Sequence, residues 1–573
     1  MSSIHTWSHP YEPDPRFAKR VAYFSMEFGI HQPLKIYSGG LGFLAGSHMR
    51  SAHDLKQNMI GIGMLWKYGY YDQIRKEDRS MGATFQKKYY PFLEDTGILV
   101  PVYINQHQVL VKALYLAPEI FGTVPMYLLT TNIEENDHLA QTITDRLYDS
   151  NHETRAVQNV ILGQAGAKVV DALGGADVYH LNEGHALPAA FHLYDKLGTV
   201  EAVREKLAFT THTPEIAGNE EADIYMLHRL GFFGNVDLDE ARSIIHQYGH
   251  TLNYTAAALT LSKRSNGVSQ LHGSVARDMW KNVPEKCEII GITNAQNKRY
   301  WADGKLEQAL QDGDDAALKA RKREMKVRLL EEVADQTGKV FDPDVLTIVW
   351  ARRFAAYKRA DLIMRDLARF TRLITDADRP IQLIWAGKPY PTDEGAISTF
   401  NHIQTYTYKR KNVAVLVGYE MALSKLLKEG SDVWLNTPRR PREASGTSGM
   451  TAAMNGSINF SVDDGWIPEF ARHGDNCFLI PAADPGQQIN KIDDRDHANM
   501  MRILEEEVIP TFYDSPSRWT EIMKASMKDV APYFDSDRMA AEYYDKLYNF
   551  EPETYTRTEI EESSDEMISD SLV

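Results

Sequence analysis

Short, almost wholly apolar runs recur along the chain, and each ends at a glycine, a proline or a charged loop before a helical pattern begins. Examples are RVAYFSMEF, VLTIVWARR, IQLIWAGK, VAVLVGY and DVWLN. Strands of a parallel sheet have this character because helices cover both of their faces. The alternation of such strands with helices predicts an α/β fold built from doubly wound, Rossmann-like units.

The strand–helix pattern occurs in two series, which predicts two domains. The first series runs to about Asn294 and the second begins near Val345, with a polar, glycine-containing stretch at residues 300–315 between them. We place the N-terminal domain at residues 1–305 and the C-terminal domain at residues 306–535. Two such domains enclose a cleft, and open parallel sheets bind ligands beyond the carboxyl ends of their strands.

The end of the chain differs from both series. Residues 539–550, MAAEYYDKLYNF, form an amphipathic helical pattern, which we assign to a separate segment at 536–552. Residues 553–573 are acidic, polar and poor in core-forming side chains, so they are predicted to be a disordered tail.

The charge and cysteine content exclude several classes of protein. Lys and Arg number 63 against 79 Asp and Glu, a net charge of −16, which argues against a nucleic-acid partner. Cys287 and Cys477 lack C-x-x-C spacing, so neither a disulfide framework nor a thiolate metal site is expected. No apolar stretch approaches the roughly 20 residues that span a bilayer. These features predict a cytoplasmic protein with no membrane partner.

A glycine-rich loop at residues 36–46, IYSGGLGFLAG, precedes a helix predicted to begin at about Leu44. Glycines before a helix let backbone N–H groups approach an anion, although many such loops are simply turns. In HLNEGHAL, His180, Glu183 and His185 fit no common zinc spacing, so we expect hydrogen-bonded polar groups and no metal.

Three further loops follow strands and carry candidate chemistry. His212, in AFTTHTPEIAGNE, is either a structural histidine or a substrate contact. The cations of VWARRFAAYKRADL crowd a strand-to-helix turn and predict an anion site, most simply for phosphate, against the alternative of a solvated helix face; they are Arg352, Arg353, Lys358 and Arg359. Glu443, in NTPRRPREASGTSGM, precedes a run of backbone donors that suits a sugar hydroxyl and an anion, or a capped helix.

Taken together, these loops resemble the α-glucan (glycogen/maltodextrin) phosphorylase family, in its short, divergent bacterial and archaeal branch. The motifs that carry the resemblance occur in the same order across residues 22–466: AYFSMEFGIHQPLKIYSGGLG, HLNEGHA, FTTHTP, GVSQLHGSVARDMW, RRFAAYKR, WAGK and NTPRRPREASGTSGM. The resemblance implies a GT-B fold, with an interdomain cleft and a C-terminal crossover helix that packs onto the N-terminal domain. It also implies transfer of a glucosyl unit, with retention, between an α-glucan and phosphate, so that the sugar phosphate is glucose 1-phosphate.

The resemblance also assigns roles to individual residues. Catalytic roles fall on His212, through its backbone carbonyl, and on Arg353, Lys358 and Glu443. Substrate contacts fall on Gly39, Gly40, Leu41, Asn294, Tyr357, Ser445 and Gly446. Thr447 and Ser448 would line the phosphate of the family's cofactor, pyridoxal phosphate, and Thr451 would stand in place of the lysine that binds this cofactor. A homodimer is compatible with the resemblance.

Two departures from the family pattern bear on the chemistry. Thr451 stands where the family has the lysine that forms a Schiff base, so covalent pyridoxal phosphate at this position is not expected, and the cofactor would bind non-covalently if at all. TNAQNKRYW, residues 293–301, lacks the family's glycine-containing turn. Two alternatives therefore remain open: a transferase that takes a nucleotide sugar as donor, and a non-catalytic glucan-binding relative.

Overall fold

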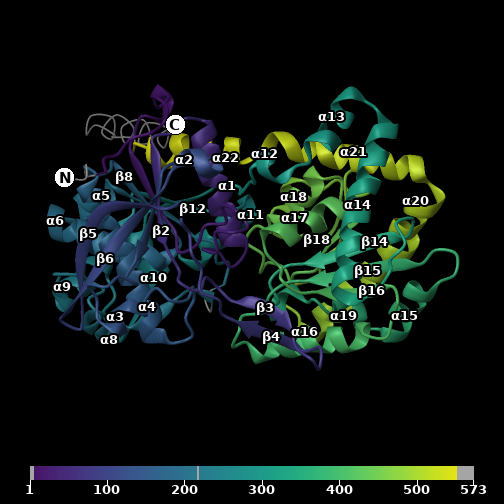
Figure 1. The fold of residues 1–573 in the computed structure, drawn as a ribbon, viewed down its shortest axis with the longest axis horizontal. Helices are drawn as coiled ribbons and strands as arrows, with labels where there is room; N and C mark the ends of the chain where they lie inside the picture. Colours follow the sequence, from purple (N-terminus) through teal and green to yellow (C-terminus); the bar gives the residue numbers. More distant parts are fainter. Residues whose placement is uncertain (1–4, 216–217, 552–573) are drawn as a thin grey trace, which may run out of the picture.

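The computed structural model describes residues 5–215 and 218–551 and contains one nine-stranded and one six-stranded sheet, each flanked by helices. We call the nine-stranded sheet with its helices the first lobe, and the six-stranded sheet with its helices the second lobe. Figure 1 shows them side by side, with the first lobe in purple to blue and the second largely in green. The α/β class and the parallel strands predicted from the apolar runs are confirmed. The predicted tail at 553–573 lies outside the described residues.

The first lobe is parallel over most of its width, with the strand order β13-β12-β9-β8-β1-β2-β7-β6-β5. The order departs in both directions from β1 and β8, so the loops after these two strands open at a switch point, where α/β sheets bind ligands. The parallel strands are β1 (Val21–Phe24), β2 (Met59–Met64), β7 (Met126–Thr130), β8 (Val178–Asn182), β9 (Leu207–Thr210), β12 (Arg264–Gly267) and β13 (Glu288–Gly291).

One edge of this sheet corrects the prediction of a purely doubly wound lobe. Strands β5 (Glu94–Ile104) and β6 (His107–Leu116) pair antiparallel, and β6 pairs antiparallel with β7. Asn105 and Gln106 connect β5 to β6 with φ of 50° and 65°, the left-handed conformation that two-residue hairpin turns require. Much of β5 alternates between buried and exposed positions, which is the pattern of a half-covered antiparallel strand.

The helices of the first lobe are mostly short, and α1 (Gly40–Asp54) begins at Gly40 rather than near Leu44, as predicted. The other helices are α2 (Pro118–Phe121), α3 (His138–Gln141), α4 (His152–Val160), α5 (Gly166–Ala172), α6 (Pro188–Leu197), α7 (Val200–Arg204), α8 (Ile224–Arg229), α9 (Leu238–Ile245), α10 (Tyr254–Leu261), α11 (Gln270–Met279) and α12 (Lys298–Trp301).

The second lobe is entirely parallel, in the order β16-β15-β14-β17-β18-β19. Its switch point lies between β14 and β17, so the loops after these strands meet at one place. The strands are β14 (Leu346–Ala351), β15 (Ile381–Ala386), β16 (Val413–Leu416), β17 (Val433–Asn436), β18 (Ile458–Val462) and β19 (Phe478–Ile480). The helices are α13 (Gly304–Asp312), α14 (Asp315–Thr337), α15 (Leu367–Thr375), α16 (Glu394–Thr407), α17 (Met421–Gly430), α18 (Ser448–Met454), α19 (Ile489–Ile503), α20 (Ile509–Asp514) and α21 (Pro516–Tyr533).

Two segments leave their own lobe to pack on the other. After α21 the chain returns to the first lobe as α22 (Ser536–Tyr543) and a further helical turn to Tyr548. Tyr543 and Tyr548 join the buried core, and the Tyr548 hydroxyl lies 2.7 Å from Nδ1 of His180. In the opposite direction, the hairpin β3 (Asp72–Arg75) and β4 (Met81–Thr84) extends beneath the second lobe, near α16 (Figure 1). Met81 belongs to the core of the second lobe. None of the helices in the described ranges combines the length and apolar character needed to cross a membrane.

Candidate active site

A cavity of ≈ 610 Å³ is lined by residues of both lobes at their two switch points. All but one of the residues to which the resemblance assigns a role line this cavity, although they come from five separate stretches of the chain. They are Gly39, Gly40, Leu41, His212, Asn294, Arg353, Tyr357, Lys358, Glu443, Ser445, Gly446, Thr447 and Ser448. The exception is Thr451, which is fully buried within α18 and whose hydroxyl donates to the Ser448 carbonyl at 3.0 Å.

The glycine loop is fixed from below by Glu27, a residue that the sequence analysis did not single out. The backbone N–H groups of Ser38 and Gly39 donate to Glu27 Oε2 at 2.6 and 3.1 Å, and the Tyr148 hydroxyl donates to Oε1 at 2.8 Å. A Cβ added at Gly39 or Gly40 would meet nothing within 4 Å. The start of α1 therefore faces open cavity space that a ligand can fill.

The cations of the loop after β14 do not all have the same surroundings. Arg352 and Lys358 both pair with Glu443, at 3.0 and 2.9 Å, while the Arg353 side chain remains exposed at the cavity. Burial would raise the pKa of Glu443, but the two cations outweigh it and lower the pKa to about 2. Glu443 is therefore a carboxylate at neutral pH.

Arg359 does not join the anion site that the four cations were predicted to form. Its guanidinium is buried and pairs with Asp493 at 2.9 Å and Asp496 at 2.8 Å. The backbone of Arg359 is left-handed, with φ of 49°, which turns the chain out of the loop. Arg359 thus ties the loop to α19, and the free positive charge of the loop is left to Arg353.

The glutamate loop after β17 is held by Asp464, which precedes Gly465 in the turn after β18. The N–H groups of Glu443 and Gly465 each donate to Asp464 at 2.9 Å. Burial raises the pKa of Asp464 to about 7. Gly446 has φ of 84°, a conformation that suits glycine, and it leads the loop directly into α18.

His212 follows β9 and lies against two polar residues that end β8. Its Nε2 donates to Asn182 Oδ1 at 2.7 Å, and its backbone N–H donates to Glu183 Oε1 at 2.5 Å. Burial lowers the pKa of His212 to about 3, so the ring is neutral, and burial raises the pKa of Glu183 to about 7. The hydrogen bonds fix the backbone at His212. The lowered pKa means that the imidazole ring does not act as a cation.

Several buried polar atoms at the cavity have no hydrogen-bond partner among the described residues. They are Oδ1 of Asn294, Oγ of Ser445, Nδ1 of His185, and Nε and Nη1 of Arg352. Buried polar groups in proteins are nearly always paired, so these atoms mark positions that a polar ligand would satisfy.

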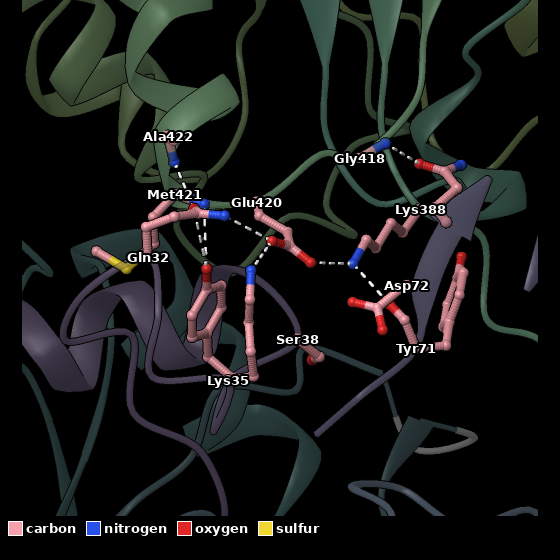
Figure 2. Close-up of polar contacts among 12 residues, drawn as sticks. Gln32, Lys35, Ser38, Tyr71, Asp72, Lys388, Gly418, Glu420, Met421 and Ala422 are labelled. Carbon is pink, nitrogen blue, oxygen red and sulfur yellow. Dashed lines mark hydrogen bonds and ion pairs between the residues drawn. The ribbon is translucent and has the colours of Figure 1, made fainter. Parts of the chain in front are cut away.

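A polar network joins the lobes at one wall of the cavity. Figure 2 shows Glu420, at the start of α17, between Lys35 of the first lobe and Lys388 of the second. Glu420 pairs with Lys35, accepts from Lys388 at 2.9 Å and accepts from Gln32 at 2.8 Å. Burial would raise the pKa of Glu420, but Lys388 and Lys35 together lower it to about 2.

Comparison with known proteins agrees with this arrangement. The family model described as carbohydrate phosphorylase matches residues 292–507. A maltodextrin phosphorylase of Thermococcus litoralis is 34% identical over 93% of this chain and 71% of its own length. A glycogen phosphorylase of Aquifex aeolicus is 30% identical over 93% of this chain and 86% of its own. An uncharacterized protein of Methanocaldococcus jannaschii is 48% identical over 92% of this chain and 100% of its own. The resemblance found in the sequence is confirmed, and the chain belongs to the carbohydrate phosphorylase family.

Proposed function

We propose that this chain is a retaining glycosyltransferase of the GT-B type that moves a glucosyl unit between an α-glucan and phosphate, forming or consuming glucose 1-phosphate. The observation that carries the proposal is that Arg353, which is exposed, and the open start of α1 line the same cavity between the lobes. A guanidinium with no carboxylate partner and backbone N–H groups that face the cavity suit a phosphate ion. A neutral glucan meets no electrostatic penalty on an acidic protein.

In this proposal, some residues around the cavity contact the sugar and others contact the phosphate. Glu443 accepts hydrogen bonds from sugar hydroxyls, and Asn294 offers its unpaired amide oxygen. The His212 carbonyl faces the positive charge that develops on the sugar ring as its bond to the leaving group breaks. Arg353 and Lys358 hold the phosphate on the same face as the leaving group, which gives retention. Preorganised charges of this kind are the largest contribution to many enzymatic rate enhancements.

The cavity also fits pyridoxal phosphate, the family's cofactor. Its volume of ≈ 610 Å³ falls within the range of small-molecule sites, and the unpaired Ser445 Oγ together with Thr447 and Ser448 offers partners for a phosphate group. When bound, the cofactor supplies a phosphate that exchanges a proton with the substrate phosphate. Thr451 would contribute no bond to it, because its hydroxyl is engaged within α18.

The test is phosphorolysis by the purified chain after incubation with pyridoxal phosphate. We expect a maltooligosaccharide and inorganic phosphate to yield the α-anomer of glucose 1-phosphate, identified by NMR. Arg353→Ala should raise the KM for phosphate about 10-fold or more, because a hydrogen bond to a charged group contributes about 1.5–3 kcal/mol. Arg365→Ala removes an exposed arginine paired with Asp494, away from the cavity, and should behave as wild type.

Two outcomes would replace the proposal. Transfer that occurs only from a nucleotide sugar would assign the anion site to a nucleoside diphosphate. Glucan binding without turnover from either donor would make the chain a non-catalytic binding protein.

A further inference from the structure

Lys428 is a buried lysine whose position nothing above explains. It lies on α17, its residue is 2% exposed, and it lines the cavity. No hydrogen bond or ion pair joins its ammonium group to any described residue, and burial is the sole cause that lowers the pKa of Lys428, to about 7. A sequence pattern gives no signal for it, because a lysine on an amphipathic helix normally faces solvent.

Other buried lysines in the described part of the second lobe are satisfied. Lys322 donates to the carbonyls of Glu429 and Asn455 at 2.7 and 2.8 Å, and Lys388 pairs with Glu420 at 2.9 Å. Lys322 also has a pKa lowered to about 7 by burial, but it does not line the cavity. Lys428 thus combines burial, access to the cavity and the lack of a polar partner.

The amine of Lys428 and the helix that carries Thr451 both lie next to Trp301. Its Nζ is 4.0 Å from the ring centre of Trp301, and Trp301 packs in one apolar cluster with Met450 of α18. The side-chain amide of Asn455 donates at 2.8 Å both to the Trp301 carbonyl and to the Thr451 carbonyl. The main chain at Trp301 and at Thr451 is therefore held together, with Lys428 against the indole.

We propose that Lys428 supplies the amine that Thr451 lacks, and that it forms an imine with the aldehyde of pyridoxal phosphate bound in the cavity. The inference rests on the proposed function only in its choice of cofactor. The lone pair of the neutral Nζ would attack the aldehyde carbon, so that a C–N bond forms as the C=O π bond breaks. The oxygen would then leave as water with the two protons of the amine, and a C=N bond would remain. The step needs no oxidant or reductant. An amine that is neutral near pH 7 is the reactive form, as in other desolvated lysines that act as nucleophiles.

The test detects the covalent bond between Lys428 and pyridoxal phosphate and does not depend on enzymatic turnover. The full chain is incubated with pyridoxal phosphate without glucan or phosphate, desalted, reduced with borohydride and digested, and the modified lysine is identified by mass spectrometry. We expect one pyridoxyl group per chain on Lys428, with none on Lys322. The rate of imine formation, followed by near-ultraviolet absorbance, should rise with pH through about 7 and level off above it, as the buried amine loses its proton.

Two variants separate Lys428 from its neighbours. Lys428→Met keeps an apolar side chain against Trp301 and should lose the label, whereas Lys425→Met removes a half-exposed lysine of the same helix and should keep it. Label on other lysines only, or no label on the wild-type chain, would overturn the proposal, and this holds even if Lys428→Met fails to fold. A labelled Lys428 without phosphorolysis would instead count against the proposed function alone, and phosphorolysis without the label would count against this inference alone.

Discussion

Glu443 shows how one side chain connects the electrostatics of the cavity to its chemistry. It is buried between Arg352 and Lys358, and its backbone N–H is fixed by Asp464. Two cations around one carboxylate leave a net positive charge, which Arg353 increases. A site that binds a phosphate needs this excess, and Glu443 prevents Arg352 and Lys358 from repelling each other.

Substituting Glu443 tests both roles. Glu443→Gln should lower glucosyl transfer by about 100-fold or more, because removal of one preorganised polar group costs this much in comparable sites. It should also lower the free energy of unfolding by about 3–5 kcal/mol, because two buried cations lose their partner. Asp463→Asn, outside the cavity lining, should leave transfer unchanged. Full activity in Glu443→Gln would remove Glu443 from the site.

The same substitution has a pH signature. The pKa of Glu443 is lowered from 4.5 to about 2, so its contribution to stability is fully present above pH 4.5 and is lost as the pH falls toward 2. The difference in unfolding free energy between the wild-type chain and Glu443→Gln should therefore shrink across this window, as measured by denaturant unfolding. A constant difference would mean that the carboxylate is not paired in the folded state.

At the scale of elements, the sequence predicted what depends on local pattern and missed what depends on packing. The buried strands β14 and β15 were evident because their sequences, LTIVWA and IQLIWA, are mostly apolar, which is typical of parallel strands. The hairpin β5–β6 was missed, although its alternation and its Asn105–Gln106 turn were present in the sequence. Glu27 and Lys428 were also missed, because their roles depend on residues far away in the chain.

Helix α1 offers a prediction that separates a packing glycine from a site glycine. A Cβ at Gly46 would lie 1.9 Å from the backbone oxygen of Gly29, whereas one at Gly40 would meet nothing. Gly46→Ala should therefore destabilise the fold by about 1–3 kcal/mol, as overpacking does. Gly40→Ala should keep the melting temperature but weaken phosphate binding, because the new methyl group enters the cavity. Equal thermal shifts in the two variants would contradict this division.

At the scale of the molecule, the cavity exists only because the two lobes are held together. The α22 segment anchors the end of the chain in the first lobe, and the β3–β4 hairpin anchors the first lobe to the second, where Gln73 donates to the Gly387 carbonyl at 2.9 Å. The Glu420 network adds a polar contact between the lobes through Lys388, which lines the cavity (Figure 2). His212 and Arg353 lie in different lobes. Weaker contacts between the lobes should therefore weaken the binding of glucan and phosphate before they destabilise the core of either lobe.

Glu420→Gln tests this coupling. The substitution leaves Lys35 and Lys388 facing each other without a carboxylate, and like charges in a poorly solvated site repel. We expect small-angle scattering to show a larger radius of gyration in the variant, and the KM for both glucan and phosphate to rise, while circular dichroism stays that of the wild-type chain. Glu394→Gln, at an exposed position on α16, is the matched control and should change none of these. If Glu420→Gln keeps the wild-type dimensions and KM values, then the crossing segments α22 and β3–β4 alone set the distance between the lobes, and Glu420 serves only to neutralise its two lysines.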